Sequence, residues 1–134
     1  MRNLIILMIL LPLQNFAADF KQAEALFLQG KFALAKPIFE KIVTEEPKNY
    51  KAIEYLGDIA GHARKWNEAL GYYEKLKKAD PKNADYQFKF GGALGMKAKE
   101  GSKFAALSLL DDVEKAFLTA AKLDPKHIES RWAL

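Results

Sequence analysis

Apolar residues recur at every third or fourth position along most of this 134-residue chain, with charged residues between them. In YKAIEYLGDIAGHA (50–63), the apolar side chains at this spacing are Ile53, Leu56 and Ala60. In KWNEALGYYEKLKKAD (65–80), they are Trp66, Ala69, Leu70, Tyr73 and Leu76. This spacing places apolar side chains on one face of a helix, whereas no stretch alternates as a half-buried strand does. The pattern therefore predicts an all-α protein.

The sequence lines up with itself when Phe39 is placed on Tyr73. FEKIVTEEPKN (39–49) then falls on YEKLKKADPKN (73–83), and AAKLDPKH (120–127) repeats the ending. The interval from Pro81 to Pro125 exceeds one period by ten residues, so the third unit contains an insertion. We expect each unit to be a helix pair. The predicted boundaries are 18–49, 50–83 and 84–127, with the insertion near 98–107 and the start of a further helix at 128–134.

A helix–turn–helix period of about 34 residues resembles the tetratricopeptide repeat. The first helix of the middle unit carries the Leu56-Gly57 pair, and Gly91 stands one period after Gly57. The matching positions of the second helices and unit ends are Ala35, Ala69, Phe39, Tyr73, Phe117, Pro47, Pro81 and Pro125. The resemblance covers about residues 18–134 and implies a right-handed superhelix (solenoid) of antiparallel helix pairs. In such a stack, small residues let helices approach and aromatic side chains fill the space around them.

Tetratricopeptide arrays generally bind partners along an inner, concave surface that the first helix of each pair lines. Transferring that pattern gives candidate partner-binding residues at Phe20, Glu24, Phe27, Glu54, Asp58, His62, Phe88, Gly92 and Met96, with Gly61 and Gly95 on the same face. Such a groove would be aromatic at its ends and acidic in its middle, and it would accept a basic or neutral extended peptide. The alternative is a solvated face with scattered apolar residues.

Some members of the family hold the C-terminal carboxylate of a peptide with lysine, asparagine and arginine from these helices. Phe20, Glu24 and Tyr55 stand at matching places here, and only Lys89 could serve, opposed by Asp85. The sequence therefore disfavours an adaptor that binds a terminal carboxylate. Glu54 and Asp58 share a helix face, as paired catalytic acids can. Because nothing nearby suggests a buried pocket, we expect both to be solvated.

The composition excludes several kinds of chemistry. Cysteine is absent and there are two histidines, which excludes disulfides and thiol catalysis and disfavours multi-histidine metal sites. In FGGALGMKAKEG (90–101), Met96 separates Gly95 from Lys97, so the phosphate-loop spacing fails. The formal net charge of +4 comes with scattered lysines, unlike a nucleic-acid-binding face. We therefore predict a protein-binding scaffold, not an enzyme, without cofactor or metal. The alternative is a non-catalytic part of a larger exported enzyme or carbohydrate-handling assembly.

The N-terminal segment MRNLIILMILLPLQNFAADF (1–20) has a different character. Arg2 precedes an apolar run at 4–13, and the small residues Ala17 and Ala18 follow. This layout is typical of a secretory signal peptide, and the run is shorter than the about 20 residues that span a bilayer. We expect a signal peptide at 1–17, cleavage after Ala17 or Ala18, and export, most simply to a bacterial periplasm. The alternative is a buried or amphipathic first helix.

The ten extra residues of the third unit allow two structures. Either both helices of the pair are lengthened by about five residues each, or a plain loop bends at Gly101. In the first case Ser102 caps a helix at 103–124, and Lys97, Lys99 and Lys103 lie at a protruding tip. The final segment IESRWAL (128–134) matches the start of another first helix. Exposed apolar residues there would favour self-association.

Overall fold

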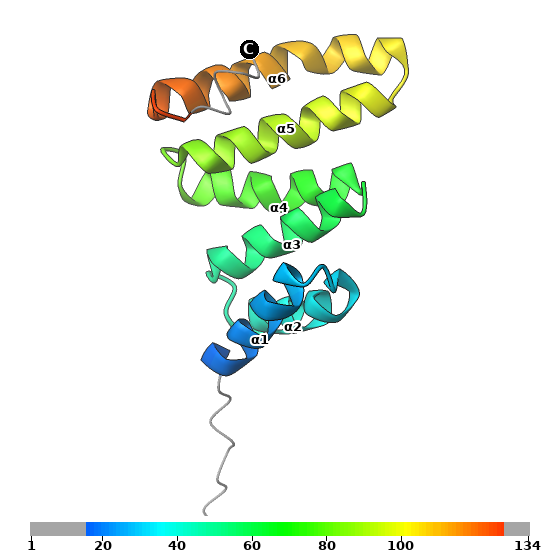
Figure 1. The fold of residues 1–134 in the computed structure, drawn as a ribbon. Coiled ribbons are helices and arrows are strands. Elements are labelled where there is room, and N and C mark those ends of the chain that lie inside the picture. The colour runs from blue at the N-terminus through cyan, green and yellow to red at the C-terminus, as the bar shows by residue number, and fades with distance from the viewer. Residues whose placement is uncertain (1–15, 128–134) are drawn as a thin grey trace, which may run out of the picture.

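The computed structural model describes residues 16–127, which form six α-helices and no strand within that range. The helices are α1 (Phe16–Leu28), α2 (Phe32–Glu45), α3 (Tyr50–His62), α4 (Trp66–Ala79), α5 (Ala84–Glu100) and α6 (Lys103–Leu123). They stack in chain order from α1 at one end of the molecule to α6 at the other (Figure 1). The prediction of an all-α solenoid of helix pairs is confirmed.

The ends of the helices follow the repeat. Asn49 and Asn83 cap α3 and α5, where their side chains accept hydrogen bonds from backbone N–H groups at 3.1 Å. Ser102 caps α6 in the same way, accepting from the N–H of Ala105 at 3.2 Å, as predicted. Each second helix ends two residues before a proline, because proline disfavours helical geometry in the residue before it.

The apolar core lies between neighbouring units as well as within them. One buried cluster joins Ala35, Phe39 and Ile42 of α2 to α3 residues that include Leu56 and Ile59. A second cluster continues from α3 and α4 into α5. One helix pair therefore does not bury its apolar stripe alone, and stacked pairs share a continuous core.

Glycine lets the two helices of a pair approach at two equivalent places. A Cβ atom at Gly57 would lie 2.6 Å from Cε1 of Tyr73 on α4, and one at Gly91 would lie 3.0 Å from Phe117 on α6. In the first unit, Ala23 occupies this position and is fully buried. The aromatic ring of the second helix thus fills the space that the missing side chain leaves.

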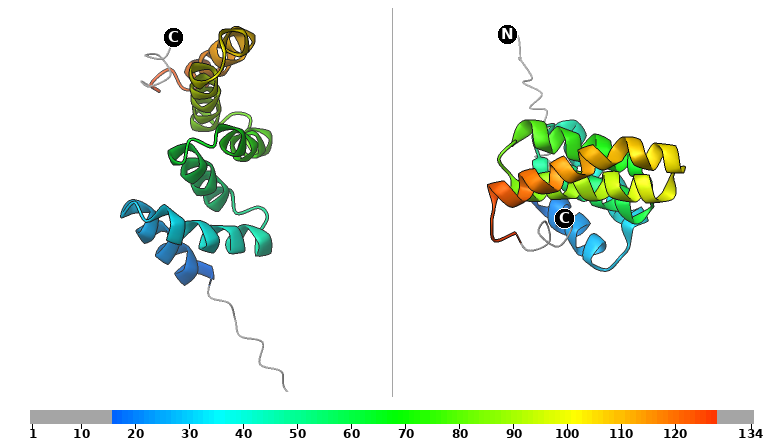
Figure 2. Two further views of the ribbon diagram at one scale, coloured as in Figure 1. Left: turned by 90° about the vertical axis from the view of Figure 1, so that its right-hand side faces the viewer. Right: turned by 90° about the horizontal axis from the view of Figure 1, so that it is seen from above.

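The third helix pair is longer than the others, as we predicted, and the plain-loop alternative is wrong. α5 and α6 have 17 and 21 residues, against 13 and 14 in α3 and α4. The extension is unequal, because α6 takes the larger share of the additional residues. At ~1.5 Å per residue this adds roughly 6 Å to α5 and 10 Å to α6. The tip, yellow in Figures 1 and 2, extends beyond the shorter helices.

The predicted signal peptide and the predicted helix start at 128–134 lie largely or wholly outside the described residues. α1 begins at Phe16, so both predicted cleavage positions, after Ala17 and after Ala18, fall in its first turn. No helix within the described range is long and apolar enough to cross a membrane. Residues 16–127 also contain no cluster of three or more acidic, histidine or cysteine side chains that could hold a metal ion.

Candidate partner-binding site

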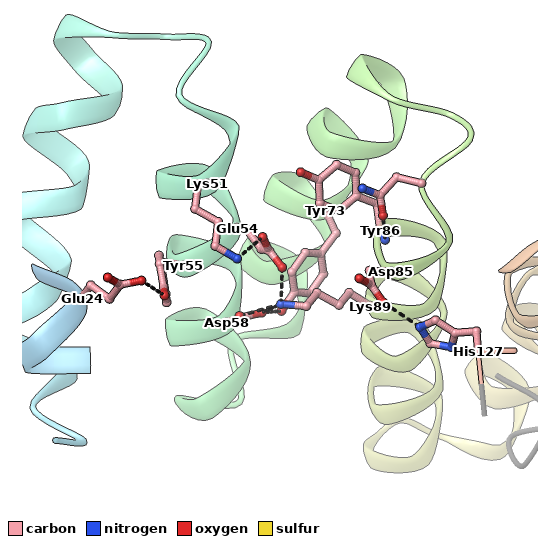
Figure 3. Close-up of polar contacts among 11 residues, drawn as sticks. Glu24, Lys51, Glu54, Tyr55, Asp58, Tyr73, Asp85, Tyr86, Lys89 and His127 are labelled. Atoms are coloured by element: carbon pink, nitrogen blue, oxygen red, sulfur yellow. Dashed lines mark hydrogen bonds and ion pairs between the residues drawn. The ribbon is translucent and has the colours of Figure 1, made fainter. Parts of the chain in front are cut away.

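A set of polar side chains links α1, α3 and α5, the first helices of the three units. We call this set, consisting of Glu24, Lys51, Glu54, Tyr55, Asp58 and Lys89, the polar ladder (Figure 3). At its centre, Nζ of Lys89 on α5 lies 2.8 Å from Oε1 of Glu54 and 2.6 Å from Oδ2 of Asp58 on α3. Lys51 contacts the other oxygen of Glu54 at 3.0 Å. Two lysines therefore face two carboxylates.

The pairing outweighs the effect of burial on these groups. Burial alone would lower the pKa of Lys89, but its hydrogen bonds to Asp58 and Glu54 raise the pKa overall. Burial alone would raise the pKa of Glu54, but hydrogen bonds from Lys89 and Lys51 lower it overall. Both partners are therefore held in their charged forms, and their charges compensate each other.

Tyrosine hydroxyls bind two carboxylates of the polar ladder, one at its α1 end and one at its centre. The hydroxyl of Tyr55 donates to Glu24 on α1 over 2.6 Å, and burial together with this bond raises the pKa of Tyr55 to about 12. The hydroxyl of Tyr73 on α4 donates to Asp58 over 2.7 Å. Burial, followed by the nearby charge of Asp58, raises the pKa of Tyr73 as well. The same tyrosine ring therefore packs against Gly57 and orients a carboxylate of the ladder.

The links between units recur with the period of the sequence. Tyr55 binds Glu24 and Lys89 binds Asp58, and each pair is separated by 31 residues. Glu24 and Asp58 occupy equivalent positions one repeat apart, as do Tyr55 and Lys89. The next equivalent of the acidic position is Gly92. A Cβ atom there would meet nothing within 4 Å, so the row of carboxylates ends in open space on α5.

The structure brings the predicted aromatic residues of the first unit together with His62. The ring of Phe27 lies 4.8 Å from that of Tyr55 and 6.1 Å from His62. His62 stacks on Phe32 of α2, with ring centroids 4.4 Å apart, and both line a cavity of about 310 Å³ between α2 and α3. Phe20 packs against Phe39, 5.7 Å away, in the core cluster. These rings therefore support the junction between the first two units.

The residues of α5 that we predicted on the partner-binding face have different environments. Phe88 lies 5.6 Å from Phe117 and 5.1 Å from His127, and His127 contacts Asp85 at 2.6 Å. Met96 is exposed, one turn beyond Gly92. Gly95, which we expected on the concave face, lies beside α6, where a Cβ atom would be 3.8 Å from Val113.

Two sequence-based expectations about the acidic centre are wrong. Glu54 and Asp58 are not solvated, because their side chains are only 13% and 22% exposed. The centre also has no uncompensated negative charge, since Lys89 crosses from the next unit. Lys89 is therefore engaged and not free to bind a terminal carboxylate. The sequence analysis missed this ion pair although its signal was present, because Lys89 stands one repeat after Tyr55.

Three helix pairs that repeat with one sequence period and share a continuous core define a helical-repeat protein of the solenoid class. Residues 26–89 match the model of the tetratricopeptide repeat, which confirms the resemblance. Residues 26–89 therefore belong to the tetratricopeptide-repeat family. No curated protein sequence matches it significantly.

Solved structures share the fold at low sequence identity. TTC0263, a thermophilic tetratricopeptide-repeat protein of Thermus thermophilus, is 15% identical with a TM-score of 0.78, covering 88% of this chain and 61% of its own. MamA (41-end) from Desulfovibrio magneticus RS-1 is 21% identical with a TM-score of 0.73, covering 87% and 60%. A mutant O-GlcNAc transferase of Thermobaculum terrenum is 17% identical with a TM-score of 0.70, covering 86% and 20%. The chain thus spans about three fifths of the first two structures.

Proposed function

We propose that this chain is an exported scaffold that binds an extended, electrically neutral peptide segment of another protein along the polar ladder. The main observation behind this proposal is that Lys89 and Lys51 compensate the negative charges of Glu54 and Asp58, the two central carboxylates of the ladder. A basic ligand would have to displace these lysines from the carboxylates. Of the basic or neutral peptides expected from the sequence, we therefore propose a neutral one. The partly exposed carboxylates and hydroxyls keep further lone pairs, which can accept hydrogen bonds from peptide N–H groups.

Gly92 gives the proposed groove room at its α5 end. It occupies the position that Glu24 and Asp58 occupy in the other units, yet nothing lies within 4 Å of the place where its Cβ would be. Phe88 and Met96 lie one turn away on either side along the same helix. A peptide that continues past Asp58 would therefore meet bare backbone flanked by apolar side chains, a surface that suits an apolar anchor residue.

Filling this space tests the proposal. Panning a phage-displayed library of random linear peptides on the full chain should enrich uncharged sequences with an apolar residue. Gly92→Leu should abolish their binding without unfolding the chain, because the new side chain enters open space. Gly71→Leu on α4, where a Cβ atom also meets nothing within 4 Å, is the matched control and should bind normally. Equal binding by Gly92→Leu, or enrichment of basic peptides only, would refute the proposed groove.

Export is the second part of the proposal and rests on the N-terminal residue pattern. The basic Arg2, the apolar run and the small residues Ala17 and Ala18 support it. N-terminal sequencing of the protein purified from its native cells should give a chain that starts at Ala18 or Asp19, recovered with the periplasmic fraction. A chain that retains Arg2 in the cytoplasmic fraction would contradict export.

A second candidate function is a repeat portion of a larger exported enzyme. The observation in its favour is the likeness to the O-GlcNAc transferase mutant, of which this chain matches 20%. The complete reading frame in the native genome tests it. A following domain with clustered catalytic side chains would support the enzyme, and further helical repeats would support the scaffold.

A further inference from the structure

The tip of the lengthened third helix pair has a chemistry that the polar ladder does not explain. Phe104 and Leu107 on α6 are 86% and 66% exposed, the largest exposures of aromatic or leucine side chains near the tip. Lys97 and Lys99 lie in the last turn of α5, and Lys103 is the first residue of α6. We define these five residues as the hairpin tip. Among the ion pairs of residues 16–127, none involves its three lysines.

Stacking of repeat units does not require the apolar residues of the tip. Phe104 and Leu107 belong to the extra length of α6, which has no counterpart in α4. The residues that α6 buries against the stack are Ala116, Phe117 and Ala120. Further along α6, the exposed Leu118 stands in the repeat position of the exposed Glu74 on α4. The exposed Phe104, Leu107 and Leu118 therefore lie on α6 away from the face that the repeat uses for its core.

Glu100 is the one acidic residue between Lys97 and Leu107, and its neighbours compensate its charge. Oε1 of Glu100 accepts hydrogen bonds from Nε and Nη2 of Arg64 at 2.9 and 2.7 Å, and Oε2 accepts one from the indole of Trp66 at 2.7 Å. These contacts brace the end of α5 against the α3–α4 turn. The tip therefore presents three lysines outside any ion pair of the described range, around apolar side chains on a supported hairpin.

We propose that the hairpin tip docks on an anionic phospholipid surface, with Phe104 and Leu107 in the interface and the lysines at the headgroup phosphates. Lysines flanking exposed phenylalanine and leucine are the combination with which interfacial segments bind such membranes. A folded peptide partner would need a groove, and the tip is a protrusion. The cavity between α2 and α3 and the cavity among α4, α5 and α6 are lined by other residues. Charge complementarity thus favours an anionic partner, and the protruding shape favours a lipid surface over a protein.

Vesicle binding by the full chain tests this proposal. The apolar run at 4–13 can itself bind lipid, so every variant keeps it. The tip variant combines Lys97→Gln, Lys99→Gln and Lys103→Gln. The control variant removes the same charge at the opposite ends of the helices, through Lys48→Gln, Lys82→Gln and Lys126→Gln. Each lysine near an anionic surface contributes about fivefold in affinity. The tip variant should therefore partition roughly 100-fold less onto phosphatidylglycerol vesicles, and the control variant should lose much less.

A site-specific label separates tip docking from binding by the N-terminal run. Because the chain lacks cysteine, Ala105→Cys at the tip and Ala79→Cys at the opposite helix end can each carry one environment-sensitive dye. The dye at 105 should report an apolar environment with phosphatidylglycerol vesicles but not with phosphatidylcholine, and the dye at 79 should not respond. Equal losses in the two triple variants, or a silent dye at 105, would overturn the proposal.

Two other occupants of the tip would give recognisable results. If two copies of the chain cover it, Phe104→Ala with Leu107→Ala would convert a dimer into a monomer in sedimentation equilibrium, and the tip dye would respond to protein concentration without vesicles. If an acidic protein covers it, the tip dye would respond to an acidic polypeptide such as polyglutamate and stay silent on vesicles. Either result would overturn docking on lipid.

Discussion

Gly57 and Tyr73 are packed so closely that a Cβ atom at Gly57 would lie 2.6 Å from Cε1 of the tyrosine ring. The ring is buried, and its hydroxyl is held by Asp58, so it has little freedom to move aside. Overpacking of a core costs about 1–3 kcal/mol, which exceeds the gain of up to ~1 kcal/mol in helix propensity. Gly57→Ala should therefore lower the free energy of unfolding by about 1–2 kcal/mol, measured by urea denaturation followed by circular dichroism.

Gly71 on α4 provides the matched control for this prediction. It is also within a helix, but a Cβ atom there meets nothing within 4 Å. Gly71→Ala should raise the free energy of unfolding by about 0.5–1 kcal/mol, since only the helix propensity changes. If both variants shifted stability in the same direction, close helix packing would not be the reason for the glycine at 57.

Removal of Lys89 should destabilise the fold through its unpaired partners. Lys89→Ala leaves the largely buried carboxylate of Asp58 without a cation and that of Glu54 with Lys51 alone. Breaking a fully buried pair costs about 3–5 kcal/mol. Discounted for the partial exposure of these groups, we expect a loss of about 2 kcal/mol in the free energy of unfolding. Lys78→Ala, which breaks the exposed pair with Glu74, should change it by less than about 0.5 kcal/mol. Equal losses of stability for Lys89→Ala and Lys78→Ala in denaturant titrations would show that Lys89 forms only an ordinary surface ion pair.

The contact of Glu100 with Trp66 should control the order of the hairpin tip. Hydrogen bonds from Trp66 and Arg64 lower the pKa of the Glu100 carboxyl, which indicates that they favour its charged form. Glu100→Gln and Trp66→Phe should each increase amide hydrogen exchange at 96–107 while leaving α3 unchanged. Glu45→Gln, at the exposed end of α2, is the control and should leave the tip as slow as in the wild type. Unchanged exchange in Glu100→Gln would show that the tip is ordered by α5–α6 packing alone.

The hydrogen bond between Tyr55 and Glu24 should make stability depend on alkaline pH. The pKa of Tyr55 is raised from 10.0 to about 12 in the folded chain. Its contribution is therefore complete below pH 10 and is lost as the pH rises toward 12, because the unfolded chain releases the proton first. The free energy of unfolding, measured by urea titration at several pH values, should fall less steeply for Tyr55→Phe than for the wild type. Tyr50→Phe, at the exposed start of α3, should keep the wild-type slope.

Much of the fold was predictable because it depends on local patterns that recur. The helix spacing, the caps Asn49 and Asn83, and the unit ends before proline each depend on interactions within a few residues. The lengthening of the third pair followed from counting residues between prolines. Its unequal division between α5 and α6 was not predicted; α5 ends at Glu100, whose carboxylate contacts Arg64 and Trp66 of the preceding unit.

The sequence by itself determined the repeat, the helices and the packing of glycine against aromatic rings, because each is encoded by short spacings and a fixed period. Only the tertiary structure decided the charge of the candidate groove. Glu54 and Asp58 are acidic in the sequence, but stacking brings Nζ of Lys89 in the next unit to 2.8 and 2.6 Å from their carboxylates. Electrostatic character depends on distance in space and on burial, and in a solenoid the neighbour that sets it comes from the adjoining repeat.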